Sequence, residues 1–347
     1  MVFTSLGATT RVIGARVFNL EGEPGDERLT PVDFEGHGMH TASTAAGIAI
    51  PNANLFSLAN GVARGAVPSA QIASYKVCGN DGCGSADLLA AFDVAIADRV
   101  DIISVSVAGY HTSFLDDPID IGAFHAMKKG ILIVCAGGNQ GPGYSNIANT
   151  APWIMTVVAS SIDRKFHTMV RLGDGTVIPG FSINTFTPPN KSMYPLVNWY
   201  LNFSACDPSV LTKDKVKGRI LYCPDAEDED ALIKQLGGVG IIRSAARAAI
   251  DKTVTVNVTA PFIASFSSRE PKEISRNILK PDIAAPGIDI LASYTTLRTM
   301  TGRQAAAAYV KTFHPSWSMA AIKSALMTTA KPMKLQADGG EFSAGLA

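Results

Sequence analysis

The chain has 347 residues, of which 47% are hydrophobic and 17% are charged, as in a well-buried globular protein of one large domain or two smaller ones. Its 30 basic and 30 acidic residues balance, which argues against nucleic acid or an anionic membrane as the main partner. No apolar run is long enough to form a membrane-spanning helix.

The first distinctive stretch in chain order is Glu35–Gly47, EGHGMHTASTAAG. After the second histidine, His40, every side chain up to Gly47 is no larger than threonine, so this helix-forming segment is suited to let a neighbouring backbone come close. Glycine on both sides of His37 removes bulk where a substrate could approach, although a lone histidine is more often structural. A metal site of His37, His40 and Glu35 is an alternative, but the spacing is not H-E-x-x-H, and we expect no metal.

Residues 70–160 alternate between strand-like and helix-like segments. The predicted helices are residues 85–100, which Ser85 can cap, and residues 117–130, with Pro118 near the start. Strands separated by helices indicate a parallel sheet that is covered on both faces and has its functional loops at the carboxyl ends of the strands. The predicted strands are residues 71–77, 101–107, 131–138 and 153–160.

A glycine-rich turn, AGGNQGP at residues 136–142, directly follows the apolar strand ILIVC. Such a turn can simply close a loop. Its asparagine, Asn139, can also point an amide into a cleft and stabilise a developing oxyanion. Neither this turn nor the His37 segment is specific when taken alone.

The composition becomes polar near residue 180. Segment 184–258 contains the acidic run DAEDED, which predicts a solvated loop. Within the segment, residues 215–223 read as a strand and residues 230–246 as a helix, a turn and a strand. This pattern predicts a small inserted domain.

The cysteines and glycosylation sequons suggest a secreted protein. Cys78 and Cys83 are close enough for a loop-closing bridge, Cys206 and Cys223 bracket a second segment, and Cys135 is left over. Spacing alone does not establish the pairing. The start of the chain lacks the layout of a signal peptide, so we expect an incomplete N-terminus. The three sequons, typical of surface loops, begin at Asn190, Asn202 and Asn257.

Eight segments, taken together and in this order, resemble the subtilisin-like serine proteases of plants. The resemblance implies an α/β fold with a subtilisin-like parallel sheet flanked by helices and a small inserted α+β protease-associated domain. Residues 1–183 and 259–347 would form the two parts of the catalytic domain, with residues 184–258 as the insert. The segments are GHGMHTASTAAG, GVARGAVPSAQIASYKVC, ADLLAAFDVAIADRVDIISVSV, AGGNQGP, APWIMTVVASSIDRKF, ASFSSREP, NILKPDIAAPGIDILAS and AAAYVKTFHPSWSMAAIKSALMTTA.

The resemblance also assigns roles to residues. His37 matches the general base of a Ser-His-Asp triad, and Asn139 matches the oxyanion-hole asparagine. Ser106, Val107 and Ala108 match the strand that pairs with the substrate backbone, for which an ordinary buried strand is the alternative. Gly137 and Gly138 match a wall of the primary specificity pocket. The implied partner is a peptide or protein, with no cofactor, and the implied location is extracellular; the oligomeric state is not encoded.

Two members of the triad are missing from this pattern. No V-I-D-T-G motif precedes His37, and Asp33, four residues before it, is expected to be a loop residue. The G-T-S-M-A-x-P-H motif of the nucleophile is also absent, since the segment YTTLRTMTGRQA joins the blocks that should flank it. Ser318 is expected to cap a helix instead. A further departure is Glu270 in SSREP, where glycine is usual.

Two hypotheses follow from this interrupted match. The chain is either an incomplete form of a secreted subtilisin-like endopeptidase or a non-catalytic relative that binds peptides or proteins. In both cases we expect the chain as given to be inactive.

Overall fold

The computed structural model describes twelve segments, and all structural statements below concern them. Contacts divide the chain into two compact units: Met1–Ala53 with Asn60–Asp163 and Thr259–Ala347, and Asn54–Ala59 with Arg164–Val258. Each unit is considered by itself. The described residues are 2–4, 11–20, 30–55, 58–79, 82–109, 113–180, 194–197, 211–222, 230–242, 247–259, 261–272 and 274–294.

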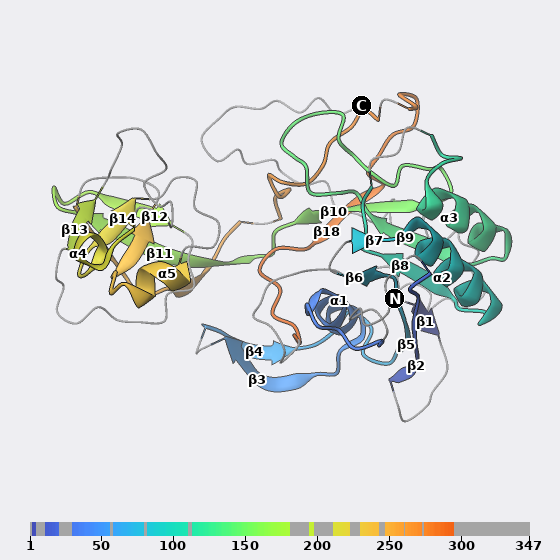
Figure 1. The fold of residues 1–347 in the computed structure, drawn as a ribbon, viewed down its shortest axis with the longest axis horizontal. Helices are drawn as coiled ribbons and strands as arrows, with labels where there is room; N and C mark the ends of the chain where they lie inside the picture. The colour runs from blue at the N-terminus through green and yellow to red at the C-terminus, as the bar shows by residue number, and fades with distance from the viewer. Residues whose placement is uncertain are drawn as a thin grey trace. The chain divides into compact units, whose positions relative to one another are not determined.

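The first unit contains a seven-stranded sheet with the order β18-β10-β9-β8-β1-β5-β2 (Figure 1). Six strands run parallel, which confirms the predicted α/β fold with a parallel sheet. The exception is β1 (Val2–Thr4), which lies antiparallel between β5 and β8. The parallel strands are β2 (Val12–Val17), β5 (Gln71–Lys76), β8 (Ile102–Val105), β9 (Leu132–Ala136), β10 (Met155–Ser160) and β18 (Ile283–Pro286).

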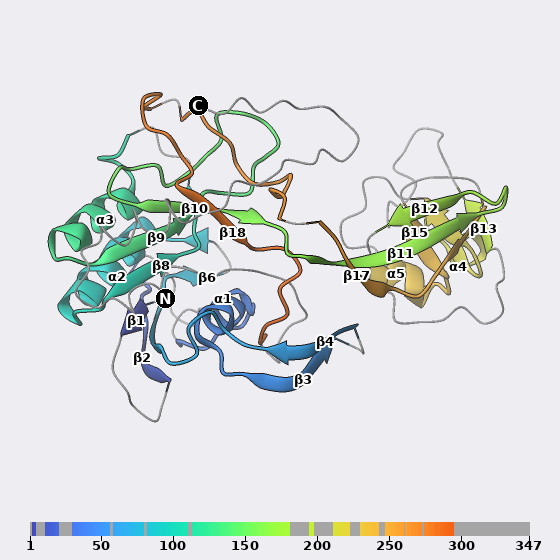
Figure 2. The ribbon, with the colours of Figure 1, turned by 180° about the vertical axis from the view of Figure 1, so that it is seen from behind.

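Helices cover both faces of this sheet, as the alternation of strands and helices in the sequence predicts. Helices α2 (Ser85–Ala97) and α3 (Pro118–Lys128) lie together on one side of β8 and β9, and α1 (His37–Ala46) lies on the other (Figures 1 and 2). Side chains therefore alternate along β9. Ile133 packs with α2 and α3, whereas Leu132 packs with α1.

The starts of the two predicted helices differ in how they are capped. Asp117 caps α3, because its carboxylate accepts hydrogen bonds from the Ile119 and Asp120 amides, and Pro118 is the first helical residue. The prediction that Ser85 caps α2 is wrong. Ser85 is already helical, and Gly84 at the cap position offers no side chain.

The small residues of α1 let other backbone segments approach closely. On one side, Ala66 and Val67 donate their amides to the Thr44 and Ala45 carbonyls at 3.0 and 2.8 Å. A Cβ on Gly65 would lie only 2.7 Å from the Ala46 nitrogen. On the other side, Ser293 donates its amide to Ser43 Oγ at 2.9 Å. The expected close approach is confirmed on both sides of the helix.

The second unit mixes helices and strands. Its main sheet has the order β12-β11-β16-β13-β14-β15, and β17 also pairs with β11. The predicted helix and strand within residues 230–246 are confirmed as α5 and β15. The predicted strand 215–223 is only partly right, because Lys215 and Val216 belong to α4 and the strand is confined to β14. The elements are β11 (Arg164–Leu172), β12 (Val177–Gly180), β13 (Tyr194–Val197), α4 (Lys213–Val216), β14 (Ile220–Tyr222), α5 (Asp230–Gln235), β15 (Gly240–Ile242), β16 (Arg247–Ile250) and β17 (Val254–Asn257).

Two short hairpins complete the described elements. Strand β3 (Ile50–Leu55) pairs with β4 (Leu58–Ala63), and β6 (Cys78–Gly79) pairs with β7 (Gly82–Cys83). Within the described part of the chain, no helix has the length and apolar character that crossing a membrane requires.

Candidate active site

His37 is the first residue of α1 and is exposed. The turn before it is fixed by Asp33, whose two carboxylate oxygens accept hydrogen bonds from the Gly36 and Met39 amides at 2.7 and 2.6 Å. Asp33 therefore acts as a local capping residue, as expected for a loop aspartate. Lys76, the last residue of β5, donates Nζ to the Val32 carbonyl at 2.8 Å. These contacts place the start of α1 at the carboxyl edge of the sheet.

The second histidine of the motif is structural. His40 is buried, and its Nε2 lies 3.0 Å from the Ile290 carbonyl oxygen, which ties α1 to the segment after β18. Burial lowers the pKa of His40, an effect opposed by this hydrogen bond and reinforced by the nearby His37. His40 is thus suited to stay neutral and to hold the helix that carries His37.

Two further candidate segments lie at the same edge. Ser106, Val107 and Ala108 directly follow β8, and Gly137, Gly138 and Asn139 directly follow β9. Because β8 and β9 are parallel neighbours, paired up to Val105 and Cys135, the segments that continue them leave the sheet side by side. Ala108 and Asn139 are exposed. The structure thus places every candidate catalytic and substrate-binding residue at the carboxyl edge.

The turn that carries Asn139 is held by backbone contacts. The Gly137 amide donates a hydrogen bond to the Val157 carbonyl at 2.8 Å, and the Gly137 carbonyl accepts a hydrogen bond from the Ala148 amide at 2.9 Å. Gly138 has a φ of 99°, and a Cβ there would lie 2.7 Å from Ser268 Oγ. Glycine is therefore required at this position for both its conformation and its small size.

Asn149 is a residue of this edge that the sequence did not reveal. Its side-chain Nδ2 donates to the Val107 carbonyl at 2.9 Å and to the Ala136 carbonyl at 2.8 Å. One buried amide thus joins the two segments that leave β8 and β9. A single sequence offers no signal for this contact, because asparagine in a loop is ordinary.

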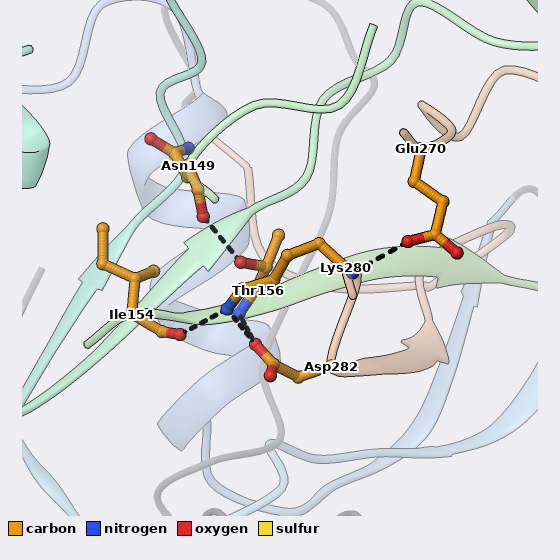
Figure 3. A network of polar contacts seen from close by, with 6 residues as sticks. All are labelled: Asn149, Ile154, Thr156, Glu270, Lys280 and Asp282. Atoms are coloured by element: carbon orange, nitrogen blue, oxygen red, sulfur yellow. Dashed lines mark hydrogen bonds and ion pairs between the residues drawn. The ribbon is translucent and has the colours of Figure 1, made fainter. Parts of the chain in front are cut away.

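A buried polar network supports Asn149 from below (Figure 3). Thr156 Oγ1 donates to the Asn149 carbonyl at 2.6 Å, and the Thr156 amide donates to Asp282 Oδ2 at 2.7 Å. Lys280 Nζ bonds the same Asp282 oxygen at 2.6 Å and the Ile154 carbonyl at 2.7 Å. Glu270, the unusual residue of SSREP, accepts the Lys280 amide at 3.0 Å.

A model of the subtilase family, peptidase family S8, matches residues 8–345. The chain belongs to the subtilase family. Subtilisin-like protease SBT4.15 of Arabidopsis thaliana is 45% identical over 411 residues, with 96% of this chain and 54% of that protein covered. SBT4.14 of the same plant is 41% identical over 409 residues, with 98% and 54% covered. The chain thus spans about half the length of these curated relatives. A solved structure, Sphericase, is 20% identical with a TM-score of 0.45, over 86% of this chain and 70% of that one.

This subtilase carries a buried carboxyl group at the start of α3. Asp120 lies in the first turn of α3 and is 4% exposed, and its Oδ1 has no hydrogen-bond partner among the described residues. Burial, together with the nearby Asp117, raises the pKa of Asp120 to about 7, although Lys272 and Lys280 oppose the shift. The folded chain therefore holds a proton on Asp120 at mildly acidic pH.

Protonation of Asp120 predicts a pH-dependent stability. Between its ordinary value of 3.8 and about 7, the folded chain keeps the proton that the unfolded chain has released. The free energy of unfolding should fall as the pH rises through this window, by on the order of 4 kcal/mol at about 1.4 kcal/mol per pKa unit. Urea unfolding from pH 4.5 to 7.5 measures this slope. Asp120→Asn should lose most of it, and an unchanged slope in that variant would contradict the assignment.

The remaining candidates concern disulfides, glycans and metals. Cys78 and Cys83 form a disulfide with a Cα–Cα distance of 4.1 Å, and Cys135 is buried and free. Asn257 ends β17 and is exposed. Among the residues that the structure describes, no three His, Cys, Asp or Glu side chains gather as metal ligands would. Four further candidates, Cys206, Cys223, Asn190 and Asn202, as well as Ser318, lie outside the described residues.

Proposed function

We propose that this subtilase is a protein of the serine endopeptidase type that, as the chain stands, binds extended peptides at the carboxyl edge of its sheet without hydrolysing them. The observation that carries the proposal is the shared edge. His37, the segment after β8 and the turn after β9 all lie there, whereas Asp33 is engaged in capping α1.

The peptide would lie along the segment after β8. The backbone of Ser106–Ala108 would pair with the peptide backbone, as an added strand does. Gly137 and Gly138 leave room for a side chain beside it, and the Asn139 amide would face the carbonyl of the bond to be cleaved. His37 would take a proton from an attacking hydroxyl. Without that hydroxyl, the bound peptide stays intact.

The strand at the centre of the sheet has no acidic residue, which supports the proposal that the triad is incomplete. Strand β1 lies between β5 and β8 and consists of Val2, Phe3 and Thr4, none of which is acidic. Among the described residues, no carboxylate forms an ion pair or hydrogen bond with the His37 ring. A catalytic histidine needs such a partner to fix its tautomer and orientation.

The length of the family match supports a missing serine segment. The match to SBT4.15 extends over 411 residues, more than the 347 of this chain, so that relative contains segments within the matched region that this chain lacks. The sequence joins Leu297 to Ala305 through RTMTGRQ, without a G-T-S-M motif. A packed core does not easily accommodate such a loss.

A complete endopeptidase encoded at the same locus is the second candidate function. The high identity to SBT4.15 and SBT4.14 favours it. Upstream and intronic DNA that encodes intact V-I-D-T-G and G-T-S-M motifs would support it, and stop codons or a true deletion there would exclude it. In either case we propose secretion, glycosylation at Asn257 and a protease-associated domain within residues 184–258.

The proposed peptide binding can be tested with a fluorescein-labelled library of eight-residue peptides. We expect the anisotropy to rise with the concentration of the chain and mass spectrometry to recover the peptides uncut. Ala108→Pro, which removes a backbone N–H from the binding segment, should abolish the rise. The proposal fails if the chain leaves the anisotropy unchanged or if it cleaves the peptides.

A further inference from the structure

We propose that Asn149 is a positioning residue that sets the spacing between the peptide-binding segment after β8 and the Asn139 turn after β9, and thereby controls peptide affinity. The inference rests on the proposed peptide binding. It assigns a role to a buried residue that neither contacts the peptide in the proposed pose nor belongs to the triad pattern.

The position of the Asn149 amide is the first argument. Ladder pairing between β8 and β9 ends at Val105 and Cys135. Just beyond this pair, Nδ2 donates to the carbonyls of Val107 and Ala136, at 2.9 and 2.8 Å. A side chain thus takes over the bridging where the backbone ladder stops. The amide thus donates one hydrogen bond to the segment after β8 and one to the end of β9, from which the Asn139 turn continues.

The rigidity of Asn149 is the second argument. The residue is 4% exposed and has a φ of 53°, a conformation that asparagine tolerates better than most residues. Thr156 Oγ1 fixes its carbonyl at 2.6 Å, and its neighbour Ala148 donates an amide to Gly137 at 2.9 Å. We call the two hydrogen bonds from Asn149 Nδ2 to the Val107 and Ala136 carbonyls the Asn149 clamp. Asn149 is thus held on β10 and on the Asn139 turn, and its side chain cannot move with the two segments if they separate.

The orientation of the amide is the third argument. Asn149 Oδ1 is buried and has no hydrogen-bond partner among the described residues. The side chain is therefore oriented by what its N–H groups donate to. An aspartate of the same shape has no N–H to donate, and its negative charge would face two carbonyl oxygens. Aspartate at this position should therefore be unable to form the two hydrogen bonds that Asn149 forms.

The experiment compares peptide affinity with stability in matched variants, using the same labelled library. Asn149→Gly removes the clamp but keeps a residue that accepts a positive φ. Val100→Ala is the control, because Val100 is buried in the core just before β8, at the opposite edge of the sheet. We expect Asn149→Gly to weaken peptide binding about tenfold, which corresponds to about 1.4 kcal/mol. Val100→Ala should lower the melting temperature and leave affinity within about twofold of the parent, which corresponds to about 0.4 kcal/mol.

A second variant keeps the inference testable if Asn149→Gly folds poorly. Thr156→Val keeps the buried shape and removes only the bond to the Asn149 carbonyl, so it should weaken binding in the same direction by a smaller factor. Hydrogen exchange should accelerate in residues 106–109 and 137–141 of both variants, and not in those of Val100→Ala. Equal losses of affinity in the control and the clamp variants, or parental affinity in the clamp variants, overturn the inference alone. A parent chain that binds no peptide overturns it together with the proposed function.

Discussion

Replacing His37 with alanine should leave the rate of peptide hydrolysis by the purified chain unchanged at background. A histidine base contributes only when it has a hydroxyl to deprotonate and a carboxylate to orient it. In a bacterial subtilisin, losing the serine or the histidine costs about 10⁶ in turnover, and about 10³–10⁴ over water remains when the whole triad is gone. Under the proposed absence of two triad members, little activity remains for this substitution to remove.

Fluorogenic peptides followed over many hours provide the measurement. His125→Ala is the matched control, because His125 is exposed in the last turn of α3, away from the carboxyl edge. The parent and both variants should give the same slow progress curves. A large fall confined to His37→Ala would show a working base and refute the proposed loss of activity.

The buried ion pair between Lys280 and Asp282 should be among the most sensitive points of the fold. Their side chains are 2% and 5% exposed, and Nζ lies 2.6 Å from Oδ2. Lys280→Met should lower the free energy of unfolding by about 3–5 kcal/mol, because it leaves the Asp282 carboxylate buried without its cation. Urea unfolding monitored by tryptophan fluorescence measures the loss.

A double variant separates charge from shape in this pair. Lys280→Met with Asp282→Asn removes both charges and keeps an oxygen for the Thr156 amide, so it should recover much of the loss. Arg171 and Asp251 provide a surface comparison, at 2.8 Å with side chains 53% and 34% exposed. Arg171→Met should cost at most about 1 kcal/mol. Equal costs for the buried and surface pairs would contradict this ranking.

The parallel sheet was predictable from the sequence because strand patterns alternate with helix patterns between residues 70 and 160. The small residues of α1 also have the predicted use. The cap of α2 was predicted wrongly because Gly84 and Ser85 are both plausible at a helix start, and only the backbone conformation decides between them.

The candidate site was predictable only in part. His37 and Asn139 stand in recognisable local patterns, whereas the role of Asn149 depends on where the Val107 and Ala136 carbonyls lie. Those positions are set by the pairing of two strands about thirty residues apart in sequence. Likewise, nothing local indicates that β1 runs antiparallel at the centre of a parallel sheet.

Labelling of the intact chain with a fluorophosphonate, a probe that reacts covalently with activated serines, tests the central claim most directly. If the attacking hydroxyl is absent, as we propose, intact mass spectrometry should find no adduct after prolonged exposure. A stoichiometric adduct would contradict the claim, and mapping it would show whether Ser318 or another serine is the nucleophile.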